Sequence, residues 1–346
     1  MGIKSHIRNA WNFLVRAFNF LLRRFHYTIV PNQLVYEWQK LPRQKPGYKP
    51  SKLPEGAAEY LVSNNPRLIE LKNRYANFDK AVTVPFIWTN NHVSDKDMLY
   101  FRGDNAYVHQ VRGRNLSIIA YALSTYYLKS IDTFGLLEKL QEDNYFGIHT
   151  FNINNKLVSR DLLDSIFEIY FIEKHLKISS RTDVSMLDIG AGYGRLAHRL
   201  TTAFPNIVEY LCTDAFAVST FISEYYLRFR NTERNTTVVP LDEINEALST
   251  RHVNLAINIH SFSECKIPAI AWWLTLLVKH QVQYLMIVPN TGQILYTNDG
   301  IEFQSIIEDH GYRLIAKEPK YNDPIILQNA ISPNYYYLFE LSMANS

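Results

Sequence analysis

A short glycine-rich stretch between a strand pattern and a helix pattern constrains the fold of this chain more than any other feature. Residues 186–195 read MLDIGAGYGR, and apolar residues with helical spacing follow through Leu200. Glycines at such a junction let the backbone approach a ligand closely, and the free N–H groups at the start of a helix favour negative charge. We therefore expect a ligand-binding turn between a strand and a helix.

The pattern around this turn predicts an α/β fold. From about residue 156, short apolar runs alternate with helix-length stretches, which is typical of βαβ units and of a parallel sheet covered on both faces. The last two runs are too close together for a long helix between them, so we expect them to form an antiparallel pair at a sheet edge. The runs are 185–189, 208–213, 237–241, 255–259, 284–288, 312–316 and 335–341.

Two kinds of nucleotide ligand are candidates for this turn. The dinucleotide fingerprint G-x-G-x-x-G requires a glycine where Arg195 stands. The chain instead has Asp188 two residues before Gly190, on the same side of the strand, where it would repel a pyrophosphate but accept hydrogen bonds from a cationic amino-acid group. A second acid, Asp214, ends the next strand 22 residues after Gly192 and is placed to hold ribose hydroxyls. Together these features indicate S-adenosylmethionine (SAM).

Three segments resemble known methyltransferases. Residues 187–196 (LDIGAGYGRL) and 257–264 (INIHSFSE) resemble class I SAM-dependent methyltransferases, and with 159–165 (SRDLLDS) they are similar to the bacterial sugar O-methyltransferase family. The class-level resemblance covers residues 156–346. It implies a methyltransferase domain with a Rossmann-like, seven-stranded sheet whose last strand is antiparallel.

The resemblance also implies roles for individual residues. Asp188 and the glycine turn would hold the methionine end of SAM, Asp214 the ribose, and the backbone near Leu241 or the side chain of Asp242 the adenine. The residues expected to contact the cofactor are Asp188, Gly190, Ala191, Gly192, Tyr193, Gly194, Asp214, Ala215, Leu241 and Asp242.

The residues that follow the strand pattern 255–259 are candidates for the chemistry, because ligands in open α/β sheets lie beyond the carboxyl ends of the strands. Methylation of an alcohol requires removal of a proton, and a neutral imidazole suits this task near pH 7. We predict that His260 is the general base and that Glu264 orients or polarises it; the alternative is a structural histidine that caps the next helix. Ser261 and Asn258 are candidates for contacting the acceptor, although Asn258 could instead serve a neighbouring loop.

We predict a metal-independent site. Hard cations require clustered carboxylates, and at the strand ends only Asp214 and Asp242 qualify, both of which have expected cofactor roles. Metal assistance is the competing mechanism.

The N-terminal residues 1–40 predict a basic amphipathic helix. Positions 7, 11, 14, 18, 21 and 25 are apolar, and no acid occurs before Glu37. Peripheral contact of residues 1–30 with an anionic membrane surface is one interpretation. The favoured alternative is a helix that covers the protein's own core or a dimer partner. The basic residues are Lys4, Arg8, Arg16, Arg23 and Arg24.

Two further segments precede the methyltransferase domain. Residues 41–60 have proline at every fourth position from 42 to 54, which predicts a Pro/Lys-rich linker or arm. Residues 61–155 predict a mainly helical, substrate-side unit, with a few short strands and a turn within 84–112. The candidates for acceptor contacts there, equally well explained as a turn and a solvated strand, are Arg102, Asp104 and Asn105.

Composition excludes several classes of protein. A net charge of +3 gives no basic excess of the kind that nucleic-acid-binding proteins carry, and two cysteines indicate a reducing compartment. We expect a cytoplasmic enzyme, with contact at the inner membrane face as the open alternative, and the oligomeric state stays open. Its expected activity is SAM-dependent O-methylation of a saccharide or glycoconjugate hydroxyl. The alternatives are another small-metabolite acceptor, or a non-catalytic SAM-binding module that recruits a partner.

Overall fold

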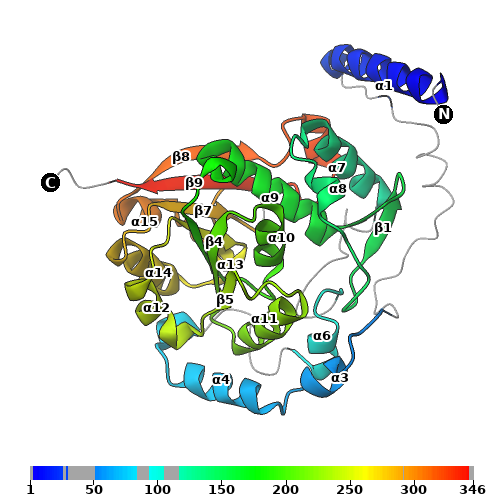
Figure 1. Ribbon diagram of the computed structural model, residues 1–346. Coiled ribbons are helices and arrows are strands. Elements are labelled where there is room, and N and C mark those ends of the chain that lie inside the picture. The colour runs from blue at the N-terminus through cyan, green and yellow to red at the C-terminus, as the bar shows by residue number, and fades with distance from the viewer. Residues whose placement is uncertain are drawn as a thin grey trace.

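The computed structural model describes residues 3–25, 29, 51–83, 93–104, 117–290 and 292–342. Its centre is a seven-stranded sheet in the order β5-β4-β3-β6-β7-β9-β8, in which every neighbouring pair is parallel except those made by β9 (Figure 1). The strands are β3 (Val184–Ile189), β4 (Ile207–Thr213), β5 (Thr236–Val238), β6 (Leu255–Ile259), β7 (Tyr284–Val288), β8 (Tyr312–Pro319) and β9 (Tyr335–Leu341). Numbered from the first of these strands, the order is 3-2-1-4-5-7-6, so the expected Rossmann-like sheet with an antiparallel last strand is confirmed.

Helices cover both faces of the sheet. In Figure 1, α9 and α10 lie on one side, and α12, α14 and α15 lie on the other. This double cover explains why all six residues of β3 are buried, because a strand between two helical layers has no solvated face. The helices that follow the N-terminal region are α9 (Arg160–Leu176), α10 (Arg195–Ala203), α11 (Ala217–Phe229), α12 (Ile244–Thr250), α13 (Ser261–Glu264), α14 (Ile267–Lys279), α15 (Gln304–Asp309) and α16 (Pro324–Asn329), with 3-10 turns η3 (Ile178–Ser180) and η4 (Leu241–Glu243).

One strand of the sheet differs from expectation. The strand expected at 237–241 ends at Val238, because Pro240 has no N–H to donate and Leu241 begins the η4 turn. The antiparallel pair at the edge is confirmed, with the short helix α16 between its strands. Within that pair β9 is the inner strand, between β7 and β8.

The N-terminal region is mainly helical and ends in a β-hairpin. Its α4 helix begins after Asn65, whose side chain accepts a hydrogen bond from the Arg67 amide. Residues 95–99, expected within a segment of short strands, are a helix because Ser94 and Asp97 form a capping box. The elements are α3 (Ala57–Tyr60), α4 (Pro66–Ala76), α5 (Lys80–Thr83), α6 (Asp95–Leu99), α7 (Ile118–Ile131), α8 (Leu136–Lys139), β1 (Thr150–Ile153) and β2 (Lys156–Ser159).

This region shares its core with the sheet domain. Its buried residues belong to the same continuous apolar cluster as the strands, and Arg67 of α4 binds Glu224 of α11 through two hydrogen bonds of 3.1 and 2.6 Å. The boundary expected at 155/156 falls in the turn of the β1–β2 hairpin. Residues 30–50, which include the first half of the expected linker, lie outside the described residues, as do 84–92 and 105–116.

A separate helix, α1 (Ile3–Leu22), with the 3-10 turn η1 (Arg23–Phe25), begins the chain. Figure 1 shows α1 apart from the body of the protein. Of the helices in the described part of the chain, none combines the length and apolar character needed to cross a membrane.

Candidate functional site

The glycine turn joins β3 to α10 at the carboxyl end of the sheet. Gly190, Gly192 and Gly194 all have positive φ, at 75°, 58° and 84°, a conformation that other residues adopt at a cost. A Cβ on Gly190 would lie 2.3 Å from both Cβ and Oγ of Ser261. The turn is therefore packed against Ser261, two positions after the end of β6, and only glycine fits there.

Two acids, the buried Asp188 and the half-buried Asp214, flank this turn. Asp188 accepts a 3.0 Å hydrogen bond from the Tyr210 hydroxyl, and Asp214 accepts the amides of Gly192 at 3.1 Å and Phe216 at 2.8 Å. Burial raises the pKa of each carboxyl to about 7. Neither acid has a salt-bridge partner within the described part of the chain, so a cationic ligand here would stabilise both charged forms. This arrangement fits the sulfonium and ammonium groups of SAM.

Helix α4 covers the side of the site where adenine is expected. The Tyr75 hydroxyl accepts the Leu241 amide at 2.8 Å and lies 2.9 Å from the Thr220 hydroxyl. Arg74 donates two hydrogen bonds, of 2.8 and 2.9 Å, to the carboxylate of Asp242. The two residues expected to meet adenine are thus already held by an N-terminal helix. The spacing of the apolar residues of α4 in the sequence indicates which face of this helix is buried. It does not indicate that Tyr75 and Arg74 bind Leu241 and Asp242.

Helix α9 holds the side of the glycine turn that leads into α10. The Tyr193 hydroxyl donates to Asp161, and Arg195 donates to Glu168 and Ser165. The side chain of Tyr193 therefore points toward α9 and also packs on Phe101 of the N-terminal region, and only its backbone belongs to the turn. The expected contacts Ala191 and Ala215 are half-buried and pack against the core.

His260 stands between β6 and α13 in a strained conformation. Its φ is 69° and its ψ is −31°, and such strain in a non-glycine residue is often found at functional sites. Its Nε2 lies 2.9 Å from the side-chain amide of Asn334, and it makes no side-chain capping hydrogen bond. Burial, followed by the nearby charge of Arg160, lowers the pKa of His260 to about 3. The imidazole is therefore neutral but a weak base, and its role as general base stays a prediction.

Glu264 forms a hydrogen bond with a residue other than His260. It accepts a 3.3 Å hydrogen bond from the Asn290 side chain, whereas the side chain paired with His260 is Asn334. The residue that orients the imidazole is therefore Asn334, which the sequence did not single out.

The expected acceptor contacts are mostly engaged elsewhere. Asn258 is fully buried; its amide donates to Ile189 O at 2.9 Å and its carbonyl accepts the Phe262 amide at 2.8 Å. It serves the neighbouring loops, which was the alternative. Arg102 is also fully buried, paired with Glu142 and Asp143 at 2.7 Å each. Ser261 is packed over Gly190, and Asp104 is half-buried, whereas Asn105 lies outside the described residues.

A polar cluster that was not predicted from the sequence lies near His260. Arg160 donates to Asp164 at 3.1 Å, and the buried Lys320 also donates to Asp164. The charges of Arg160, Asp164 and Lys320 all act on the pKa of His260. The hydroxyl of Tyr121 is buried without a hydrogen-bond partner in the described part of the chain, and it is close enough to Arg160 and Asp164 for their charges to affect its pKa. This cluster is the candidate wall of an acceptor site.

The sequence matches no protein-family model and no curated protein sequence. Solved structures do resemble the chain. Magnesium protoporphyrin IX methyltransferase from Synechocystis PCC 6803, solved with SAM, has 10% identity and a TM-score of 0.40, covering 65% of this chain and 96% of its own. TrmK of M. capricolum, solved with S-adenosyl-homocysteine, has 11% identity and a TM-score of 0.34, with 51% and 68% covered.

A SAM-dependent methyltransferase from Clostridium acetobutylicum has 10% identity and a TM-score of 0.37, with 52% of this chain and 92% of its own chain covered. TM-scores at this level describe a likeness of fold and not of activity. The chain's own strand order and glycine turn define the fold of class I SAM-dependent methyltransferases.

Proposed function

We propose that this protein is a SAM-dependent methyltransferase. The observation that carries the proposal is a pair of carboxylates with raised pKa, the buried Asp188 and the half-buried Asp214, on either side of a turn of three positive-φ glycines. SAM, when bound, supplies a methyl group on a positively charged sulfur. Asp188 would hold the cationic methionine end, and Asp214, fixed by the amides of Gly192 and Phe216, would accept hydrogen bonds from the ribose hydroxyls.

The chain's own residues would exclude water and position the acceptor. Tyr75 and Leu241 close the adenine side, which strengthens electrostatic interactions inside the site. His260 presents a neutral imidazole beside Asn334. We propose that it accepts the hydroxyl proton as the carbon–oxygen bond forms, and that no metal ion takes part.

For the acceptor we propose a hydroxyl of a saccharide or glycoconjugate. Arg160, Asp164 and Asn334 offer hydrogen-bond donors and acceptors near His260, and polyhydroxyl ligands require such groups. The similarity of segments 159–165, 187–196 and 257–264 to sugar O-methyltransferases supports this class.

Calorimetry with SAM and S-adenosylhomocysteine on the full chain tests the donor. We expect Asp214→Asn to weaken binding at least tenfold, and the matched exposed variant Asp183→Asn to bind like the wild type. Absence of binding by the wild-type protein would refute the proposal. Mass spectrometry of sugar nucleotides and cell-envelope glycans after incubation with SAM then tests for one methyl group added to oxygen.

The weak basicity of His260 favours a second candidate, a non-catalytic SAM-binding module. Such a protein would bind SAM with the same dependence on Asp214 but transfer no methyl group to any acceptor. Single-turnover measurements with excess enzyme separate the two, because even a slow enzyme consumes its bound SAM when the acceptor is present.

A further inference from the structure

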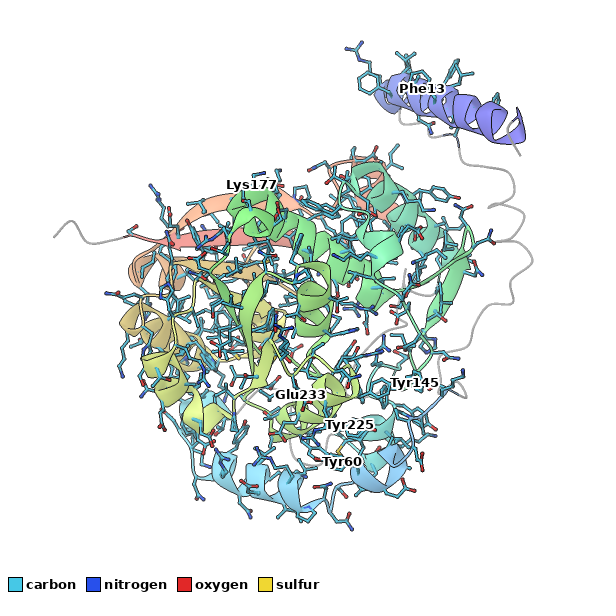
Figure 2. The ribbon with its side chains drawn as sticks, in the orientation of Figure 1. Phe13, Tyr60, Tyr145, Lys177, Tyr225 and Glu233 are labelled. Atoms are coloured by element: carbon cyan, nitrogen blue, oxygen red, sulfur yellow. The ribbon has the colours of Figure 1, made fainter. Side chains whose placement is uncertain are left out.

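The apolar side of α1 has no cover in the described part of the structure. Seven large apolar side chains of α1 and η1 have exposed fractions between 55% and 73%. Figure 2 shows Phe13 on α1, clear of the body of the protein. We call five of them, spaced alternately three and four positions apart on one face, the apolar side of α1: Trp11, Leu14, Phe18, Leu21 and Phe25. Phe13 and Phe20 are exposed as well, but the helical repeat places them on another face.

Within the described residues, the helix is not packed on the protein's own core, which was part of the favoured interpretation of the amphipathic pattern. Isolated exposed apolar residues are ordinary, but contiguous groups of this size mark interaction surfaces. The side chain of Asn19 exchanges two hydrogen bonds with the backbone of Ile29, at 3.1 and 2.7 Å. These bonds engage the polar side of the helix and leave the apolar side open.

The charge of this segment has one sign. Residues 1–36 contain no aspartate or glutamate, and their five basic residues fall within or just after α1. A helix of this kind is attracted to anionic lipid, at about fivefold in affinity for each basic residue near the surface. Its aromatic and leucine side chains suit the boundary between headgroups and acyl chains.

We propose that α1 lies flat on an anionic lipid surface with its apolar side buried among the lipids. Its 20 residues give a rod of roughly 30 Å, and the helix is not apolar enough to cross the bilayer. A second copy of the chain is a poorer occupant. Paired helices are held in register by opposite charges beside the apolar seam, whereas two copies of α1 would bring only arginine and lysine together.

Flotation of the full-length protein with lipid vesicles tests this proposal. We expect the protein to float with phosphatidylcholine vesicles containing one quarter phosphatidylglycerol, and to stay behind with pure phosphatidylcholine. The fluorescence of Trp11, isolated by comparison with Trp11→Phe, should shift to the blue only with the anionic vesicles. Salt should weaken the binding, because it screens the attraction.

Matched variants identify the surface responsible. Phe18→Ser with Leu21→Ser should reduce vesicle binding at least tenfold, and Arg16→Gln with Arg23→Gln about twentyfold. Val208→Ser, which changes an exposed apolar residue on β4, should have no effect. All of these variants should keep the thermal unfolding midpoint of the wild type, so a loss of binding cannot reflect unfolding.

Three results would overturn the proposal. One is absence of binding to anionic vesicles, and another is equal binding by the wild type and by Phe18→Ser with Leu21→Ser. The third is a wild-type dimer in sedimentation that the same double variant dissociates, without any binding to lipid. In that case a second copy of the chain covers the apolar side of α1.

Discussion

Arg195 and Glu168 form two parallel hydrogen bonds, of 2.8 and 2.9 Å, that join the first residue of α10 to the middle of α9. Side-chain exposure is 18% for the arginine and 4% for the glutamate. Since Tyr193 is held by Asp161 of the same helix, the end of the glycine turn that leads into α10 is fixed before any ligand binds. Preorganisation of this kind lowers the entropy cost of binding.

Glu168→Gln tests the importance of this contact. The substitution keeps the size of the side chain but removes the charge beside Arg195, so we expect a loss of about 2 kcal/mol in the free energy of unfolding. SAM affinity should fall about three- to tenfold. Urea denaturation and calorimetry measure the two effects. Glu246→Gln on the exposed side of α12 is the control, and an equal loss in that variant would contradict the explanation.

Asp188 makes stability depend on pH. Burial raises its pKa from 3.8 to about 7 in the folded protein, so between these values the folded state binds more protons than the unfolded state. Stability without ligand therefore decreases as the pH rises from about 4 to 7, by at most about 4 kcal/mol from this group. We expect Asp188→Asn to raise the thermal midpoint at pH 8, but not at pH 4. An unchanged midpoint at both values would show that the carboxylate is not strained by burial.

Cofactor binding should have the opposite dependence on pH. The charged forms of Asp188 and Asp214 favour a cationic ligand, and each pKa is about 7, so SAM affinity should rise between pH 6 and pH 8. Binding at pH 7 should release protons from the protein. Calorimetry in two buffers of different ionisation enthalpy measures the release, which should be smaller for Asp214→Asn. Proton uptake would contradict this prediction.

Tyr75→Phe tests the cover of the adenine side. Removing the hydroxyl leaves the buried amide of Leu241 without its acceptor, which costs about 1–3 kcal/mol of stability. We expect weaker SAM binding as well, because this wall of the site loosens. Tyr60→Phe is the matched control, since Tyr60 also packs against α11, where it stacks on Phe221 at 5.2 Å. Equal effects in the two variants would exclude a specific role for the Tyr75 hydroxyl.

His260→Ala tests the proposed proton transfer. If His260 removes the hydroxyl proton, transfer should slow by about 10²–10⁴-fold, while SAM affinity stays within about threefold of the wild type. Asn334→Ala should give a smaller loss, because it removes only the partner of His260 Nε2. Turnover near the wild-type rate in His260→Ala would leave the general base elsewhere.

The strands were predictable because each is marked by a short apolar run in its own part of the sequence. Residues 255–259, 284–288 and 335–341 are strands with the expected bounds, since a buried strand reads as a continuous apolar run. The partners of polar side chains carry no such local signal. Tyr75 meets Leu241 across 166 positions, and His260 meets Asn334 across 74.

Arg102 was predicted to contact a ligand, but its partners lie within the protein. Its sequence context of polar and aromatic residues suggested a ligand contact, but its partners, Glu142 and Asp143, follow 40 and 41 positions later. Burial then turns an apparent binding group into an internal ion pair. Glu264, expected to orient His260, is bonded to Asn290, and the bond to His260 comes from Asn334. Four residues of separation across a strand-to-helix junction do not define the direction of a side chain.

The position of β9 has a consequence for biosynthesis. Because β9 lies between β7 and β8, β8 has no neighbour to pair with while the ribosome is still adding residues 335–341. The edge of β7 stays open during the same interval, although the turn and both flanking acids have already emerged. A nascent chain stalled at that point would therefore expose two unpaired strand edges, which makes it a target for chaperones or for aggregation.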